Sequence, residues 1–115
     1  MAISSEMTAL LERLYQDLDV IKQQVTEGLD LARRHLYHFP NNALLIQLFA
    51  SLNNALLFRE TSKRVIEETV EDISADDVLP EIVQETGEDS ATLLGRVVEV
   101  RISVSRIKDR LSNWP

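Results

Sequence analysis

The first third of the chain carries apolar residues at the spacing of an α-helix. These positions follow one another at alternating steps of four and three residues without a break, and we call them the seam of the helix. They are Met7, Leu11, Leu14, Leu18, Ile21, Val25, Gly28, Ala32, His35 and Phe39. Such a heptad pattern is typical of coiled coils and helix bundles, because it places one stripe along one side of a helix. We therefore predict that residues 1–39 form a first helical segment, with the helix running from about Ser5 to His38.

Pro40 interrupts this pattern. Proline lacks a backbone N–H and disfavours helical geometry in the residue before it, so the first helix must end near Phe39. Asn41 and Asn42 follow, and both residue types turn the chain and cap helices well. Because so short a connection makes two helices antiparallel neighbours, we predict a long helical hairpin whose second helix covers residues 42–75.

The first half of this second helix, residues 43–58, is apolar on nearly every side. A helix that is apolar almost all round must be buried almost all round, and a chain of 115 residues has few other elements to cover it. We therefore predict that the hairpin associates with itself into a bundle. The residues expected at the interface between copies are Leu44, Leu45, Leu48, Phe49, Leu52 and Leu56.

Two basic residues, Arg59 and Lys63, interrupt the apolar seam of the second helix. When the hairpin is folded about its turn, they face the level of residues 17–22 on the first helix. Polar groups within an apolar seam can determine the register of two helices. We therefore predict a polar layer in which Arg59 or Lys63 contacts Asp17, Asp19 or a carboxylate of a second copy.

The composition changes after residue 75. Residues 76–89 are acidic, and they contain Pro80, which can open a short helix, and Gly87, which can close it, so we predict an acidic connector. Apolar and polar residues alternate within residues 96–106, as they do in a β-strand. However, apolar residues at the three–four spacing of a helix extend over a longer span, and a single strand would have no partner in this chain. We therefore predict a C-terminal helix over 90–115 and a single all-α domain, residues 1–115.

The net charge of −7 is unevenly distributed along the chain. Residues 60–89 carry two basic and eleven acidic side chains, whereas residues 90–115 carry five basic and two acidic ones. We interpret this as a basic C-terminal helix that packs along the acidic part of the second helix. The expected ion pairs join Arg96, Arg101, Arg106 or Arg110 to Glu60, Glu67, Glu68 or Glu71. The acidic total argues against a nucleic-acid partner, because binding phosphates requires a basic footprint.

The chain contains no cysteine, which excludes disulfides, thiolate zinc sites and a cysteine nucleophile. The first residues lack the basic and apolar segments of a signal peptide, and no run approaches the ~20 apolar residues of a membrane span. We therefore expect a cytoplasmic protein that does not bind membranes. We also expect no metal or other cofactor, since two histidines are too few for a zinc site.

His35 and His38 lie in the stretch Arg-Arg-His-Leu-Tyr-His-Phe-Pro-Asn-Asn. This stretch resembles the phosphoacceptor region of histidine kinases and histidine phosphotransferases. In one group of that family a proline follows the histidine by five residues, as Pro40 follows His35, and in another an Asn-Asn pair follows it, as after His38. Leu36 stands where an acidic neighbour is usual. The resemblance implies a histidine phosphotransfer protein of a two-component pathway, with His35 or His38 as phosphoacceptor.

No other stretch indicates catalytic chemistry. The three glycines are isolated, so no phosphate-binding loop is present, and the carboxylates of the second helix follow the pattern of a solvated face. We therefore predict a small, non-enzymatic interaction or regulatory protein that acts through helical surfaces. Its expected partners are a second copy of itself and another protein, and histidine phosphotransfer is the alternative function.

Overall fold

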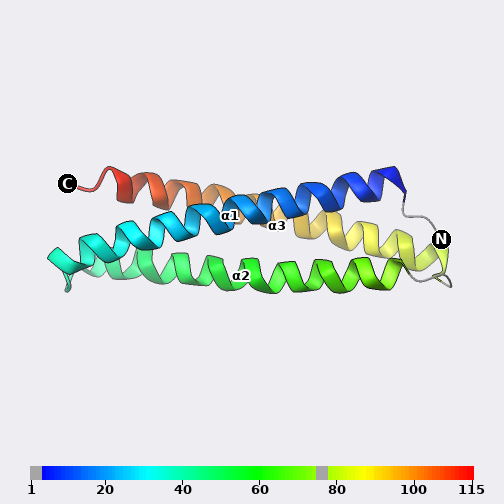
Figure 1. The fold of residues 1–115 in the computed structure, drawn as a ribbon, viewed down its shortest axis with the longest axis horizontal. Helices are drawn as coiled ribbons and strands as arrows, with labels where there is room; N and C mark the ends of the chain where they lie inside the picture. Colours follow the sequence, from blue (N-terminus) through cyan, green and yellow to red (C-terminus); the bar gives the residue numbers. More distant parts are fainter. Residues whose placement is uncertain (1–3, 75–77) are drawn as a thin grey trace.

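The computed structural model describes residues 4–74 and 78–115 of the chain. Three α-helices follow one another: α1 (Ser5–His38), α2 (Ala43–Ile73) and α3 (Pro80–Ser112). They lie side by side along a rod of 58 × 18 × 17 Å (Figure 1). The predicted all-α class is confirmed, and residues 96–106 are helical throughout. None of the described helices has the length and apolarity needed to cross a membrane.

The hairpin begins and ends as its capping residues predict. The Ser4 hydroxyl oxygen accepts a hydrogen bond from the Met7 N–H at 3.1 Å and caps α1. Asn42 caps α2 in the same way, with its side-chain oxygen 3.0 Å from the Leu45 nitrogen. Between the two helices, Pro40 prevents α1 from continuing.

The third helix is longer than predicted, because residues 80–89 are not a connector but its first turns. Pro80 stands in the first turn, where the missing N–H of proline costs nothing. Gly87 does not end the helix, since an internal glycine costs only ~1 kcal/mol and packing can offset this amount. That packing comes from a buried heptad seam, whose members are Ser90, Val97, Val104 and Leu111.

The three helices run up, down and up, so α1 is antiparallel to α2 and parallel to α3 (Figure 1). α1 lies against both neighbours and supplies half of the buried apolar core. The core consists of Met7, Leu11, Leu14, Leu18, Ile21, Val25, Leu29, Ala32, Leu45, Leu48, Leu52, Ile66, Ile73, Val97, Val104 and Leu111. The contact between α2 and α3 is the sparsest of the three, so the bundle is most open on that side.

The core corrects the predicted interface between copies. Leu45 and Leu52 are fully buried and Leu48 is only 8% exposed within the single chain. They are therefore interior residues and not, as predicted, a surface for a second copy, because three full-length helices cover more of α2 than a hairpin with a short third helix could. The other three expected interface residues, Leu44, Phe49 and Leu56, are half-buried at the edge of this core.

Gly28 marks the closest approach of α1 and α2. A Cβ atom added to Gly28 would lie 3.0 Å from a terminal methyl group of Leu52, so any larger residue must displace that side chain. Folding the hairpin about residues 40–42 pairs positions whose numbers add up to about 80, and Gly28 and Leu52 satisfy this relation. The glycine therefore allows a large residue of α2 to reach the backbone of α1.

We expect Gly28→Leu to lower the free energy of unfolding by about 1–3 kcal/mol, because the added side chain overpacks the contact with Leu52. Gly87→Ala is the matched control. Its Cβ would meet only the Met7 sulfur, at an ordinary 3.9 Å, and should raise stability by up to ~1 kcal/mol through helix propensity. Urea denaturation followed by circular dichroism measures both changes. A stabilised Gly28→Leu variant would contradict the close approach.

Candidate interaction surface

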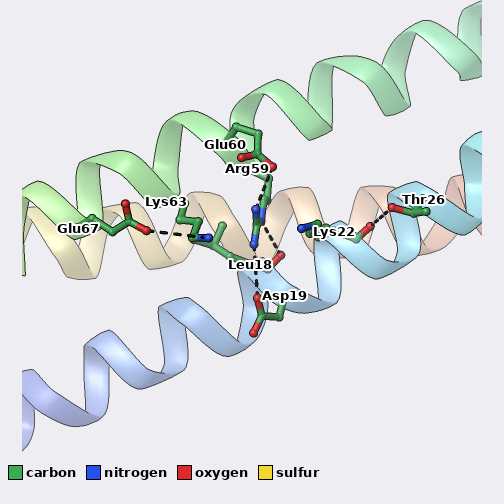
Figure 2. Close-up of polar contacts among 8 residues, drawn as sticks. All are labelled: Leu18, Asp19, Lys22, Thr26, Arg59, Glu60, Lys63 and Glu67. Atoms are coloured by element: carbon green, nitrogen blue, oxygen red, sulfur yellow. Dashed lines mark hydrogen bonds and ion pairs between the residues drawn. The ribbon is translucent and has the colours of Figure 1, made fainter.

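A buried arginine lies between α1 and α2 near the middle of the rod. The Arg59 side chain is only 4% exposed, and its guanidinium reaches the Asp19 carboxylate of α1 at 3.4 Å and the Glu60 carboxylate at 2.9 Å (Figure 2). Its Nε atom also donates to the carbonyl oxygen of Leu18 at 3.4 Å. The structure thus brings together Arg59 and Asp19, and their hydrogen bond connects the two helices at one register.

The rest of the predicted polar layer lies apart from Arg59. Lys63 is half-exposed and pairs with Glu67 of its own helix, at the outer limit of 4.0 Å. The hydrogen bond and positive charge of Arg59 hold the pKa of Glu60 below its ordinary value, so this carboxylate stays ionised beside it. The layer between α1 and α2 is therefore Arg59 with two acidic neighbours, while Lys63 borders solvent.

Asp17 faces α3 and not α2. Its carboxylate is largely buried, 3.1 Å from the Arg13 guanidinium on α1 and 3.7 Å from the Arg101 guanidinium on α3. A second ion pair joins the same helices further along, between Lys108 of α3 and Glu27 of α1. The hydrogen bond and charge of Lys108 lower the pKa of Glu27. Both contacts connect helices that run in the same direction.

These contacts overturn the predicted pairing of α3 with the acidic part of α2. In residues 4–74 and 78–115, no ion pair joins Arg96, Arg101, Arg106 or Arg110 to Glu60, Glu67, Glu68 or Glu71. Arg96 lies instead over the ring of Phe58, with its guanidinium carbon 5.6 Å from the centroid. Since α3 is antiparallel to α2, its acidic first turns lie beside the acidic last turns of α2 (Figure 1).

The fold consequently separates charge along the rod. The basic half, residues 22–58 and 96–115, carries eight basic and four acidic side chains, a net charge of +4. The acidic half, residues 4–21, 59–74 and 78–95, carries four basic and 13 acidic side chains, a net charge of −9. Figure 1 shows each half as one end of the rod, because α1 and α3 run one way and α2 runs back.

A groove runs between α2 and α3 across both halves. It consists of two hollows of about 360 and 420 Å³, which meet at Phe58 and Arg96. Apolar side chains line much of it, and Val65 at its edge is 46% exposed. The apolar lining includes Phe58, Val65, Leu93, Val100 and Ile107. We call this the α2–α3 groove, and it follows from the sparse contact between these two helices.

The two histidines lie at the end of the rod that holds the hairpin turn, with different surroundings. His35 Nε2 donates a hydrogen bond of 2.8 Å to the Leu111 carbonyl oxygen in the last turn of α3, and Trp114 packs near its ring. His38 is exposed, and its ring meets Tyr37 edge-on at 5.3 Å between centroids. His35 therefore connects the end of α3 to α1, whereas His38 faces solvent.

Sequence reasoning missed the groove and the pairs between α1 and α3. In both pairs, Asp17–Arg101 and Glu27–Lys108, the residue of α3 follows the residue of α1 by a similar number of positions. This regularity can be used only once α1 and α3 are known to be parallel.

Within residues 4–74 and 78–115, no group of three or more potential ligands could hold a metal ion.

No protein-family model matches the sequence, and neither the search of curated proteins nor the search of solved structures gave a match.

Arg59 is buried, whereas its partners Asp19 and Glu60 are exposed. Removing the arginine and removing the carboxylates should therefore change the free energy of unfolding by different amounts. We expect Arg59→Met to change the free energy of unfolding by less than ~1 kcal/mol, because it removes the buried charge and keeps most of the volume. Asp19→Asn combined with Glu60→Gln should destabilise more, since it leaves a buried cation without a carboxylate. Urea denaturation of the variants tests this order, and the reverse order would contradict it.

The contact between Glu27 and Lys108 can be tested by titration. We expect Lys108→Met to raise the pKa of Glu27 toward its ordinary value of 4.5, measured by NMR of the carboxyl carbon, while Lys108→Arg keeps the pKa low. Because the folded pKa is lowered, the contact stabilises the fold above pH 4.5, and this stabilisation is lost as the pH falls through the lowered pKa. An unchanged titration in Lys108→Met would rule out the contact.

Proposed function

We propose that this chain is a small, non-enzymatic interaction protein of the cytoplasm that binds a protein partner through the α2–α3 groove. The observation that carries the proposal is an open, largely apolar groove along the side of the rod where the contact between helices is sparsest. Apolar surface that a fold leaves uncovered is characteristic of interaction sites. The cytoplasmic location is proposed from the cysteine-free composition.

The shape and the lining of the groove suit a helical partner. The helices α2 and α3 border it on either side along the rod. A further helix packed between them would extend the bundle. Phe58 and Arg96 lie at its centre, and both residue types are enriched in protein interfaces. Serine and threonine hydroxyls such as Ser103 and Thr61 give the remaining lining hydrogen-bonding capacity.

Site-specific photo-crosslinking in the native cell tests this proposal. We expect a benzoylphenylalanine at Phe58, in the groove, to give a discrete cross-linked protein product on illumination. The same residue at Tyr37, which is 85% exposed at the hairpin turn, should give none. Both positions hold aromatic side chains, so the replacements are comparable in size.

A second substitution in the Phe58 derivative establishes whether the groove itself is responsible. Val65→Glu should abolish the product, because it places a charge at the apolar edge of the groove. Ile46→Glu is the matched control on the same helix: Ile46 is 50% exposed, similar to Val65, but lies outside the groove. A product that survives Val65→Glu, or no product from Phe58, would refute the proposal.

A further inference from the structure

The end of the rod that holds the hairpin turn exposes aromatic side chains. Tyr37 is 85% exposed and Phe39 is 51% exposed, and neither lines the α2–α3 groove. Trp114 lies at the same end of the rod, half-buried beside the ring of His35. Apolar side chains gathered on an exposed surface are characteristic of sites that something else covers.

The same end of the rod is basic. Residues 31–49 and 106–115, which we call the tip, carry five basic side chains and one acidic one, a net charge of +4 (Figure 1). In the part of the chain that the structure describes, three of these basic side chains form no ion pair: Arg34, Arg106 and Arg110. Their charge is therefore available to an anionic partner.

Cationic and aromatic side chains lie next to one another on the last turns of α1. Arg33, Arg34, Tyr37 and His38 line a shallow hollow of about 420 Å³, and all four are exposed. Arg33 pairs only with Asp30, itself exposed, at 3.4 Å. The tip thus presents positive charge and aromatic rings on one open surface.

We infer that the tip binds the surface of an anionic lipid bilayer, with the rod standing on its end. Basic side chains are attracted to anionic headgroups, and aromatic rings favour the boundary between headgroups and acyl chains. The expectation that the chain does not bind membranes rested on the lack of a run long enough to span one, and binding at the surface needs no such run. This inference is independent of the α2–α3 groove.

The separation of charge along the rod determines the orientation. An anionic surface attracts the tip and repels the acidic half, whose net charge is −9. In a rod 58 Å long that stands on its tip, the acidic half lies farther from the bilayer than two Debye lengths, ~16 Å at physiological salt, so the repulsion is screened. A rod lying flat would press that half against the headgroups. The upright rod also leaves the α2–α3 groove open to a protein partner.

A bilayer suits the tip better than a folded protein or the acidic half of another copy. Stable protein interfaces bury about 800 Å² on each side, whereas the rod is only 18 by 17 Å across at its end. A lipid surface requires no matching shape, because charge acts over a Debye length and each aromatic ring can insert by itself. The small, basic and aromatic end of the rod therefore fits a fluid anionic surface.

Co-sedimentation of the full chain with lipid vesicles at low salt tests the role of charge. We expect binding to phosphatidylcholine vesicles that contain about one-third phosphatidylserine, and at least about tenfold weaker binding to pure phosphatidylcholine. Arg33→Gln combined with Arg34→Gln should lower the partition coefficient on the anionic vesicles by about tenfold or more, since each basic side chain near the surface raises it about fivefold. Circular dichroism verifies that these exposed substitutions leave the helices folded.

The matched control is Lys63→Gln combined with Arg64→Gln. It removes the same charge from the chain, but from the acidic half of the rod. We expect it to change the partition coefficient by less than about twofold, because these residues lie beyond the reach of the surface when the rod is upright. Equal losses in the two double variants would overturn the proposal, as would a wild-type chain that does not bind the anionic vesicles.

A fluorescent label tests insertion and orientation, since the chain has no cysteine of its own. Tyr37→Cys, Leu57→Cys and Ile82→Cys replace exposed side chains at the tip, at the middle of α2 and near the start of α3. With an environment-sensitive dye on each, we expect anionic vesicles to shift only the emission at position 37 to the blue. Nitroxide-labelled lipids should quench that dye alone. A similar shift at position 57 or 82 would indicate a flat rod and overturn the upright one, and no shift at position 37 would overturn insertion.

Sedimentation equilibrium without lipid examines the competing occupant. Oligomers that grow with concentration and are lost in the Arg33→Gln, Arg34→Gln protein would assign the tip to the acidic half of another copy, and would overturn the proposal. None of these substitutions alters a residue that lines the groove. The Phe58 photo-crosslink therefore tests the proposed function separately, and either can fail without the other.

Discussion

The structure depends on burying the apolar seam of α1, which reaches from Met7 to Ala32 and faces two helices at once. A single helix cannot hide a stripe of this length, and α2 covers only one side of it. α3 covers the other side because its own heptad seam, from Ser90 to Leu111, runs the same way. Once α1 is covered on both sides, α2 and α3 meet only along their edges, and the groove between them is the consequence.

The direction of each helix decides where the charges lie. Within the sequence, the acidic stretch 60–89 spans the connection between α2 and α3, so an antiparallel fold places both of its parts at one end of the rod. The same fold places the basic turns of α3 beside the uncharged first half of α2. The two ends of the rod therefore carry net charges of opposite sign.

Polar contacts in this bundle orient the helices more than they stabilise them. Arg59 with Asp19 sets α2 against α1, and Asp17 with Arg101 sets α3 against α1. Exposed ion pairs contribute little free energy, and a buried charge offsets part of its attraction through lost hydration. The His35 hydrogen bond to Leu111 acts in the same way at the end of α3. Stability comes from the apolar seams, and these contacts select one register among several.

The sequence by itself determined the helices of the hairpin, the turn at Pro40, the level at which Gly28 meets α2 and a polar layer near Arg59, whose partner Asp19 only the structure selected. Heptad spacing, capping and turn chemistry are local properties, and a short turn allows only one way to pair two helices. The tertiary structure alone decided that α3 begins at Pro80, that its basic residues contact α1, and that Leu45, Leu48 and Leu52 are interior. The physical reason is that the position of a third helix depends on which uncovered apolar surface it buries, and that surface exists only after the first two helices have packed.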